Sequence, residues 1–375
     1  LEEILPLSKE YEFLVIYTST PSFPNDVKIA EAFKHKNKKL LIGFCGAHVA
    51  INPDHSVLAS DAIDFVARSE FDFTIKEIAE GNALEDTDGL TYKKNGQPVH
   101  NKPRSMIKNM DTLPWVTKVY KDHLVTTDYY NGYMLHPYMS FYTGRGCKSR
   151  CSFCLWPQTI SGHNYRTRSV KNIVAEISWA KDNFPEIKEF FFDDDTLTDN
   201  IPHVEALAKE IGKLGITWSC NAKANVPYET LKIMKDNGLR LLLVGYESGN
   251  KKILVNIKKG IRLDIARQFT RDCHQLGILI HGTFIVGLPG ETSETIEETI
   301  NYAKELNPQT IQVSLPAAYP GTLLYKQATE NGWLIANENL VGSSGVQHSI
   351  ISYPHLSSKE IFEAVDNFYK RFYFR

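Results

Sequence analysis

The sequence predicts an α/β protein in which an N-terminal Rossmann-like domain is followed by a partial (β/α)6 barrel. Apolar segments of strand length alternate with amphipathic segments of helix length along most of the 375 residues. Gly215, Gly238 and Gly277 each fall between such a helix and the next strand, a position that favours glycine. Polar motifs directly follow several strands, which is where parallel α/β folds carry their chemistry.

The N-terminal domain is expected over residues 1–101. Strands are predicted at residues 13–17, 40–45 and 62–66, helices at residues 25–35 and 74–80, and a hairpin over residues 88–101. The alternation indicates a parallel, doubly wound sheet, and Asn95-Gly96 is typical of a two-residue hairpin turn. The pattern opens partway through such a domain, so we expect its first strand to be missing. Residues 102–137 are expected to form an irregular connector.

The partial barrel is expected over residues 138–320, and a C-terminal helical extension over residues 321–375. Its six strands are predicted at residues 138–143, 189–193, 217–221, 240–246, 279–286 and 310–314. Its five crossover helices are predicted at residues 170–183, 203–214, 227–237, 263–276 and 293–306. Six strands at this spacing predict a partial barrel and not the full eight.

Composition is that of an ordinary globular protein, with 42% hydrophobic and 23% charged residues. A formal net charge of −2 gives no reason to expect a nucleic-acid partner. No apolar run reaches the roughly 20 residues that a membrane-spanning helix needs, and the first residues lack a signal-peptide pattern. We therefore expect a cytoplasmic protein. Because the chain begins at Leu1 and not at Met, we expect it to be trimmed at both ends.

Three of the six cysteines, Cys147, Cys151 and Cys154, lie within eight residues, just after the first barrel strand. A disulfide scaffold would have more cysteines at more even spacing. Three thiolates on one short loop can ligate three irons of a cubane cluster and leave the fourth iron open. The alternative is a structural zinc ion, which needs a fourth ligand, and His163 is the nearest residue that could provide one.

Three further motifs follow later barrel strands. They are FFFDDD at residues 190–195, VGYESG at residues 244–249 and GTFIVGLPGE at residues 282–291. Each motif alone is weak, because a glycine-rich strand end is usually only a turn. Two residues after the cysteine loop, Arg166 and Arg168, are interpreted either as carboxylate ligands or as ion-pair partners.

The cysteine motif, with the aromatic Phe153 before its third cysteine, resembles that of the radical S-adenosylmethionine (SAM) superfamily. The resemblance implies an enzyme with a 4Fe-4S cluster and SAM as cofactors, and Phe153 beside them. It implies that Asp193 and Asp194 bind the amino group of SAM, and that Glu247 and Ser248 face its ribose or carboxylate. It also implies that the fifth-strand motif, at Ile285 and Gly287, contacts adenine. No residue is assigned as catalytic.

The N-terminal domain resembles the cobalamin-binding module of some of these enzymes, notably at residues 46–48 and 66–71. Modules that hold cobalamin through histidine carry the motif D-x-H-x-x-G, and the string Asp272 to Gly277 matches it literally. We interpret this match as coincidence, because it falls on a barrel helix and not after an N-terminal strand. Cobalamin is therefore possible as a cofactor, but no correctly placed histidine motif supports it.

Several longer runs, among them residues 147–169 and 190–200, resemble radical SAM proteins of hopanoid biosynthesis. The resemblance implies that a 5′-deoxyadenosyl radical drives contraction of an amino-sugar headgroup to the cyclitol ether. It also implies a lipid or other small-molecule substrate and a reductant such as flavodoxin or ferredoxin. One alternative is a cobalamin-dependent radical SAM methyltransferase acting on a lipid or other small molecule. Another is a metal-binding module without activity.

A hopanoid substrate would bring the protein to the inner face of the membrane. The aromatic and basic residues 368–375 suit either peripheral membrane contact or a helix that packs on the barrel.

Overall fold

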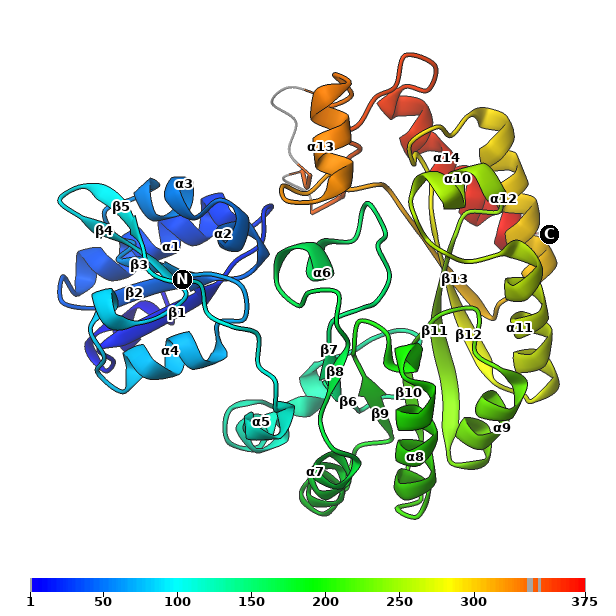
Figure 1. Cartoon of the computed structure of the whole chain (residues 1–375), viewed down its shortest axis with the longest axis horizontal. Coiled ribbons are helices and arrows are strands. Elements are labelled where there is room, and N and C mark those ends of the chain that lie inside the picture. Colours follow the sequence, from blue (N-terminus) through cyan, green and yellow to red (C-terminus); the bar gives the residue numbers. More distant parts are fainter. Residues whose placement is uncertain (1, 336–339, 343–344, 375) are drawn as a thin grey trace.

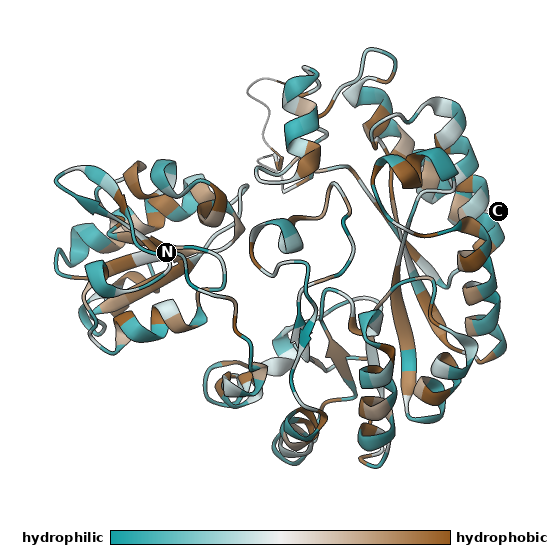
Figure 2. Ribbon diagram, in the orientation of Figure 1, coloured by the Kyte–Doolittle hydropathy of each residue, from teal (hydrophilic) through white to brown (hydrophobic). Residues whose placement is uncertain are grey.

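The computed structural model describes residues 2–335, 340–342 and 345–374 and contains two separate parallel-type sheets (Figure 1). The N-terminal sheet has five strands and the barrel sheet has six. Apolar residues concentrate on the strands and on the helix faces turned toward them, while the outer helix faces are polar (Figure 2). The predicted fold class is confirmed.

The N-terminal sheet has the order β1-β2-β3-β4-β5. Its strands are β1 (Phe13–Tyr17), β2 (Leu41–Cys45), β3 (Phe65–Ala67), β4 (Leu90–Lys94) and β5 (Gln97–His100). Its helices are α1 (Phe23–Lys36), α2 (Ala47–Ile51), α3 (Pro53–Leu58) and α4 (Asp72–Ala79). Only β1, β2 and β3 pair in parallel, and the predicted hairpin extends the same sheet as antiparallel β4 and β5. The sheet is therefore mixed, because β4 runs antiparallel to β3 and a two-residue turn then joins β4 to β5.

The sequence predicts an irregular connector over residues 102–137, but the segment is not wholly irregular. It contains helix α5 (Val116–His123), which packs against α7 of the barrel. The buried carboxylate of Glu176 on α7 accepts hydrogen bonds from the backbone N–H and the hydroxyl of Thr117 at 3.2 and 2.9 Å. A helix this short is stabilised by such tertiary contacts more than by its own sequence.

The barrel sheet is open and fully parallel, with the order β13-β12-β11-β10-β9-β6. Its strands are β6 (Tyr138–Phe141), β9 (Glu189–Phe192), β10 (Trp218–Ala222), β11 (Leu239–Glu247), β12 (Leu279–Ile285) and β13 (Thr310–Ser314). Its crossover helices are α7 (Val170–Asn183), α8 (Ile201–Gly212), α9 (Tyr228–Asp236), α11 (Leu263–Gln275) and α12 (Ser293–Leu306). They cover the outer face of the sheet (Figure 1). Gly215, Gly238 and Gly277 have φ of +64°, +96° and +66°, as expected of glycines that end helices.

Short elements in the loops after the strands were not predicted. The ribbon of β7 (Gly144–Arg145) and β8 (Arg166–Thr167) encloses the cysteine loop, which we define as residues 146–165 and which contains α6 (Leu155–Thr159). Helix α10 (Lys251–Asn256) follows β11. In Figure 1, α6 lies between the N-terminal sheet and the barrel, and α2 packs against it.

The C-terminal extension contains α13 (Leu323–Glu330) and α14 (Ser358–Tyr373). Helix α14 packs on α12 and β13 and buries Phe368 and Phe372. The hydroxyl of Tyr369 accepts a hydrogen bond from the backbone N–H of Val313 at 2.8 Å. Helix packing thus accounts for Phe368, Tyr369 and Phe372, whereas Phe374 is 88% exposed. Arg375 lies outside the described residues.

Among the described residues, no helix has the length and apolar character that crossing a membrane requires.

Candidate active site

A cavity of about 520 Å³ opens at the carboxyl ends of the barrel strands. The three clustered cysteines line it together with side chains from every barrel strand. Of the residues predicted to form the site, those on its wall are Cys147, Cys151, Phe153, Cys154, Asp193 and Glu247. The structure thus brings most of the predicted site into one cavity.

Backbone hydrogen bonds hold the cysteine loop in place. Gly146, with φ of +94°, lies so close to the loop's return that an added Cβ would come within 2.4 Å of the Asn164 carbonyl oxygen. The Ser152 N–H donates to the Ile257 carbonyl at 2.9 Å, and the Ser152 carbonyl accepts from the Leu324 N–H at 2.9 Å. Segments far apart in the sequence therefore fix the position of the cysteines.

The three thiols of the cysteine loop are largely shielded from solvent. Cys147 and Cys151 are each 7% exposed, and burial raises the pKa of the Cys154 thiol to about 12. A coordinating iron reverses that preference, because metal binding deprotonates a thiol. Among the described residues, no three His, Cys, Asp or Glu side chains converge on one point as a single metal ion would require. The Nδ1 atom of His163, the residue considered as a fourth zinc ligand, lies 2.9 Å from the Ser149 carbonyl.

The three consecutive aspartates have different surroundings. Asp193 lines the cavity, and its Oδ1 accepts from the Asn221 amide at 3.3 Å. Asp195 also lines the cavity and accepts from the Gly146 N–H at 3.0 Å. Burial raises the pKa of Asp193, the hydrogen bond from Asn221 opposes that rise, and the nearby Asp195 adds to it.

Asp194 is fully buried and does not line the cavity. It accepts from the Thr143 N–H at 2.6 Å, the Thr143 hydroxyl at 2.6 Å and the Tyr165 hydroxyl at 2.5 Å. Because both of its oxygens are engaged, its predicted role as a SAM ligand does not fit this structure. Successive residues of an extended chain point to opposite sides, which separates Asp194 from its two neighbours.

On β11, Glu247 has φ of +63° and pairs with Lys259 at 2.6 Å, so both side chains reach the cavity. Ser248, the neighbouring predicted ligand, is fully buried, and its hydroxyl lies 3.1 Å from that of Thr299. It is therefore turned away from the cavity wall. Its predicted contact with SAM does not fit this structure either.

The fifth-strand residues lie outside the cavity lining. Ile285 packs in an apolar cluster with Ile257 and Leu288. Gly287, with φ of +96°, donates its N–H to the buried Glu291 carboxylate at 2.5 Å, and an added Cβ would come within 2.6 Å of Ile361. The side chains here are structural, and the predicted contact of the backbone edge with adenine stays a prediction.

One residue that sequence reasoning missed, Tyr133, lines the cavity beside His281, which the sequence left open as either a core histidine or a substrate-facing one. Tyr133 of the connector stacks on His281 of β12, with ring centroids 4.2 Å apart. His281 is 5% exposed, and its Nε2 atom has no partner among the described residues. The Tyr133 carbonyl accepts from Arg240 at 2.7 Å, and Arg240 also pairs with the buried Glu189 at 2.7 Å. A connector cannot be assigned to a barrel mouth from sequence, because nothing in its pattern specifies the partner strand.

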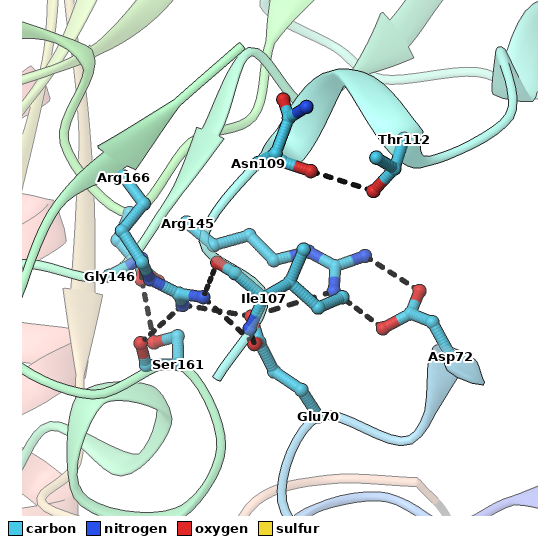
Figure 3. Close-up of polar contacts among 10 residues, drawn as sticks. Glu70, Asp72, Ile107, Asn109, Thr112, Arg145, Gly146, Ser161 and Arg166 are labelled. Carbon is cyan, nitrogen blue, oxygen red and sulfur yellow. Dashed lines mark hydrogen bonds and ion pairs between the residues drawn. The ribbon is translucent and has the colours of Figure 1, made fainter. Parts of the chain in front are cut away.

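A buried ion-pair network joins the cysteine loop to the N-terminal domain (Figure 3). Arg166 of β8 makes two bonds of 2.8 Å to Glu70, which follows β3 and is 2% exposed. Arg145 of β7 makes a similar pair with Asp72 at 2.6 and 3.0 Å. Glu70 also accepts the N–H of Ile107 at 2.8 Å.

The other arginine considered as a ligand, Arg168, pairs with the buried Glu176 at 2.5 Å. Both Arg166 and Arg168 therefore act as ion-pair partners in this structure.

The D-x-H-x-x-G string lies on α11 and in the turn that Gly277 ends, on the barrel and away from the N-terminal sheet. This position agrees with the interpretation that the match to the cobalamin motif is a coincidence.

Comparison with known proteins identifies relatives. The model of the radical SAM superfamily matches residues 141–303. A methyltransferase of Pyrococcus horikoshii, itself uncharacterized, is 30% identical over 374 residues, which cover 96% of this chain and 79% of that protein. Cytidylyl-2-hydroxyethylphosphonate methyltransferase of Streptomyces wedmorensis is 28% identical over 62% of this chain, and the match spans 45% of that enzyme's length.

Among solved structures, the radical SAM methyltransferase TsrM of Kitasatospora setae has a similar fold. With tryptophan and a SAM analogue bound, it superposes with a TM-score of 0.76 at 15% identity, over 99% of this chain and 80% of that one. A second structure of TsrM contains cobalamin and a [4Fe-4S] cluster. The likeness covers both the N-terminal sheet and the barrel.

These relatives overturn the expected reaction. Ring contraction in hopanoid biosynthesis is wrong as the assignment, because the relatives reported are methyltransferases and none acts in that pathway by name. Two of the runs that suggested hopanoid proteins, residues 147–169 and 190–200, lie within residues 141–303, which the model of the whole superfamily matches. Those runs carry no information on the substrate.

Proposed function

The chain belongs to the radical SAM superfamily, and we propose that it is a cobalamin-dependent radical SAM methyltransferase that acts on a small molecule. Membership of the superfamily implies a 4Fe-4S cluster and SAM. The observation that carries the proposal is the 30% identity to a methyltransferase over 96% of the chain, N-terminal domain included.

Cys147, Cys151 and Cys154 are the residues we assign to three irons of the cluster. Their common cavity, their burial and the closed backbone of the cysteine loop fit a rigid cubane better than a flexible exposed site. Phe153 lines the same cavity and also packs against the apolar cluster that contains Ile257 and Leu288. This packing anchors the cysteine loop on the barrel.

Asp193 is the residue we assign to the amino group of SAM. It lines the same cavity as the cysteines, and no lysine or arginine pairs with it among the described residues. An unpaired carboxylate in a half-buried wall attracts a cation strongly. Glu247 is neutralised by Lys259, and we assign this pair to the polar end of the same cofactor.

We assign cobalamin to the carboxyl edge of the N-terminal sheet. Gly46 follows β2 with φ of +113°, and an added Cβ would come within 2.3 Å of the Thr18 carbonyl. The Ser19 and Ser22 hydroxyls lie 3.0 Å apart after β1, and the buried Nε2 of His48 has no partner in the described chain. Uncharged hydrogen-bonding groups suit the amide side chains of cobalamin.

When bound, the cluster with SAM supplies one-electron cleavage of a sulfonium, and cobalamin supplies a carrier for a methyl group. The chain's own contribution is to hold the two cofactor sites in fixed positions relative to the cavity. The ion pairs of Figure 3 tie the cysteine loop to the domain that we assign to cobalamin. The connector closes the inner end of the cavity beside His281 and excludes water there.

The decisive experiment is anaerobic reconstitution with iron, sulfide and hydroxocobalamin, followed by reduction and addition of SAM with methyl-group label. We expect bound iron and cobalt in the desalted protein and release of S-adenosylhomocysteine. Cys151→Ala should lose the iron, whereas Cys220→Ala, a buried core cysteine, should keep it. Release of 5′-deoxyadenosine without any S-adenosylhomocysteine would contradict methyl transfer.

A further inference from the structure

A second groove lies on the outer side of the cavity wall, between α10 and α11. It measures about 790 Å³. Its rim is rich in cationic side chains around one exposed apolar residue, and includes Lys251, Val255, Lys258, Arg262 and Arg267. We call this feature the basic groove. Helix α10 follows β11 directly, so the basic groove lies at the same end of the barrel as the cysteine loop (Figure 1).

The basic groove carries an unbalanced positive charge. Arg262 pairs with Asp264 at 2.6 Å, and Arg267 pairs with Glu305 at 2.7 Å. Lys251 and Lys258, with the neighbouring Lys252, have exposed side chains. No carboxylate of the described chain lies within ion-pair distance of these three lysines. The chain as a whole has a formal net charge of −2, so this concentration of unpaired cations is local.

All three of these lysines occupy positions that local structure disfavours. Lys251 and Lys252 occupy the first turn of α10, which contains no acidic residue, although the amino end of a helix favours negative charge. Lys258 has φ of +56°, a conformation that is costly for a residue with a side chain. Such conflicts between local preference and structure are typical of functional positions.

The wall between the basic groove and the cavity is formed by consecutive residues of one turn. The Ile257 carbonyl accepts the N–H of Ser152, next to Cys151, at 2.9 Å. Lys258 faces the basic groove, whereas Lys259 lines the cavity. A partner seated in the basic groove is thus separated from the cysteine loop by a single backbone segment.

We propose that the basic groove is the docking site of an acidic one-electron carrier protein that reduces the cluster. The inference rests on the proposed function, because it takes the cluster to be held by the cysteines. An iron–sulfur cluster gains an electron only from a donor outside it, and a protein donor must dock close to the cluster. The carrier loses one electron, the cluster gains it, and no bond forms or breaks.

Charge and exposed apolar surface together indicate a protein partner. Unpaired lysines steer an acidic partner and raise its association rate. Val255, 67% exposed, and Ile265, 43% exposed, offer apolar contact beside them. Electron-transfer encounters bury little surface and dissociate quickly, so a groove with a small apolar centre and a charged rim suits them.

The test uses the full reconstituted protein and a flavodoxin of acidic surface charge. Flavodoxin hydroquinone, oxidised to the semiquinone, should reduce the cluster, and stopped-flow absorbance follows the rate. We expect the triple variant Lys251→Glu, Lys252→Glu and Lys258→Glu to slow this rate by about tenfold at low salt, and the difference to shrink at high salt. Thermophoretic binding of oxidised flavodoxin to cluster-free protein gives a second readout that needs no cluster.

The matched control reverses three exposed lysines of the N-terminal domain, Lys36, Lys38 and Lys39, and should change the rate less than about twofold. Dithionite should reduce wild type and both variants at equal rates. Failure of dithionite in wild type would instead contradict the proposed function. An unchanged flavodoxin rate and affinity in the basic-groove variant would overturn the docking site. The docking site would also be overturned if the basic-groove variant lost only its binding to phosphatidylglycerol vesicles. That result would make the basic groove a membrane contact.

Discussion

At the scale of single residues, adjacent carboxylates have different roles, because one faces the cavity and the other is buried among hydrogen-bond donors. Asp193 and Asp194 are adjacent in sequence, yet one lines the cavity and the other is sealed behind it. A run of three aspartates predicts an acidic strand end. It does not tell which side chain points inward, since that depends on where the strand stops and the loop begins.

This difference gives a matched pair of substitutions. Asp194→Asn should lower the free energy of unfolding by about 2–4 kcal/mol, because an amide cannot accept from Thr143 and Tyr165 with both of its ends. Asp193→Asn should change that free energy by less than about 1 kcal/mol and weaken SAM binding by about tenfold. Urea unfolding and equilibrium dialysis measure the two effects. Equal destabilisation by both variants would contradict the assignment.

Glu291 provides a pH-dependent prediction. Burial raises its pKa from 4.5 to about 7, although the N–H groups of Gly287 and Leu288 oppose the rise. The unfolded chain therefore loses this proton at lower pH than the folded one. The contribution of Glu291 to stability is therefore fully present below pH 4.5 and is lost as the pH rises through about 7, by about 3 kcal/mol in all.

Glu291→Gln keeps an oxygen that can accept both N–H groups and cannot ionise. We expect its unfolding free energy to vary less than that of wild type between pH 5 and pH 8, measured by urea unfolding at each pH. Parallel curves for the two proteins would refute the role of this carboxyl. The variant should leave iron binding unchanged, because Glu291 lies outside the cavity lining.

At the scale of elements, the regular parts of the chain could be predicted and the short parts could not. Helices α7 and α12 begin and end where the sequence indicates, because amphipathic periodicity and terminal residues act over the whole element. Helices α6 and α10 have five and six residues. Helices of that length owe their existence to tertiary packing, which no local pattern records.

The ribbon of β7 and β8 is the clearest such case. Its two residues per strand are held by Glu70 and Asp72 from another domain. Glu70→Gln should leave Arg166 with a buried, unbalanced charge and lower the unfolding free energy by about 3–5 kcal/mol. Hydrogen exchange should also accelerate within the cysteine loop.

The matched control is Glu77→Gln, which removes a carboxylate paired with Arg104 at a more exposed site of the same domain. It should cost about 1 kcal/mol or less and leave exchange in the cysteine loop unchanged. If both variants affected the cysteine loop equally, the effect would be one of domain stability and not of the Glu70 contact. Calorimetry with peptide-resolved hydrogen exchange distinguishes the two.

At the scale of the whole molecule, the sequence predicted the cofactor end of the cavity far better than the substrate end. The spacing of the cysteines identifies them in the sequence, and its place at the end of a strand identifies Asp193. Tyr133 and His281 come from a connector and from mid-strand and meet only in the folded chain. The substrate is recognised at such positions, which is why local resemblance led to the wrong reaction.

Ion pairs and one helix–helix contact join the N-terminal domain to the cysteine loop of the barrel. Residues 18–22 and 46–48 lie at the edge that we assign to cobalamin, and α2, which begins at Ala47, packs on α6 of the cysteine loop. Hydroxocobalamin should therefore slow hydrogen exchange at this edge and also at residues 155–161, across the domain boundary. In the Glu70→Gln variant, hydroxocobalamin should still protect the edge assigned to cobalamin, but its protection of residues 155–161 should weaken. Protection of the edge alone in wild type would mean that the ion pairs fix the domains in place without transmitting cofactor binding.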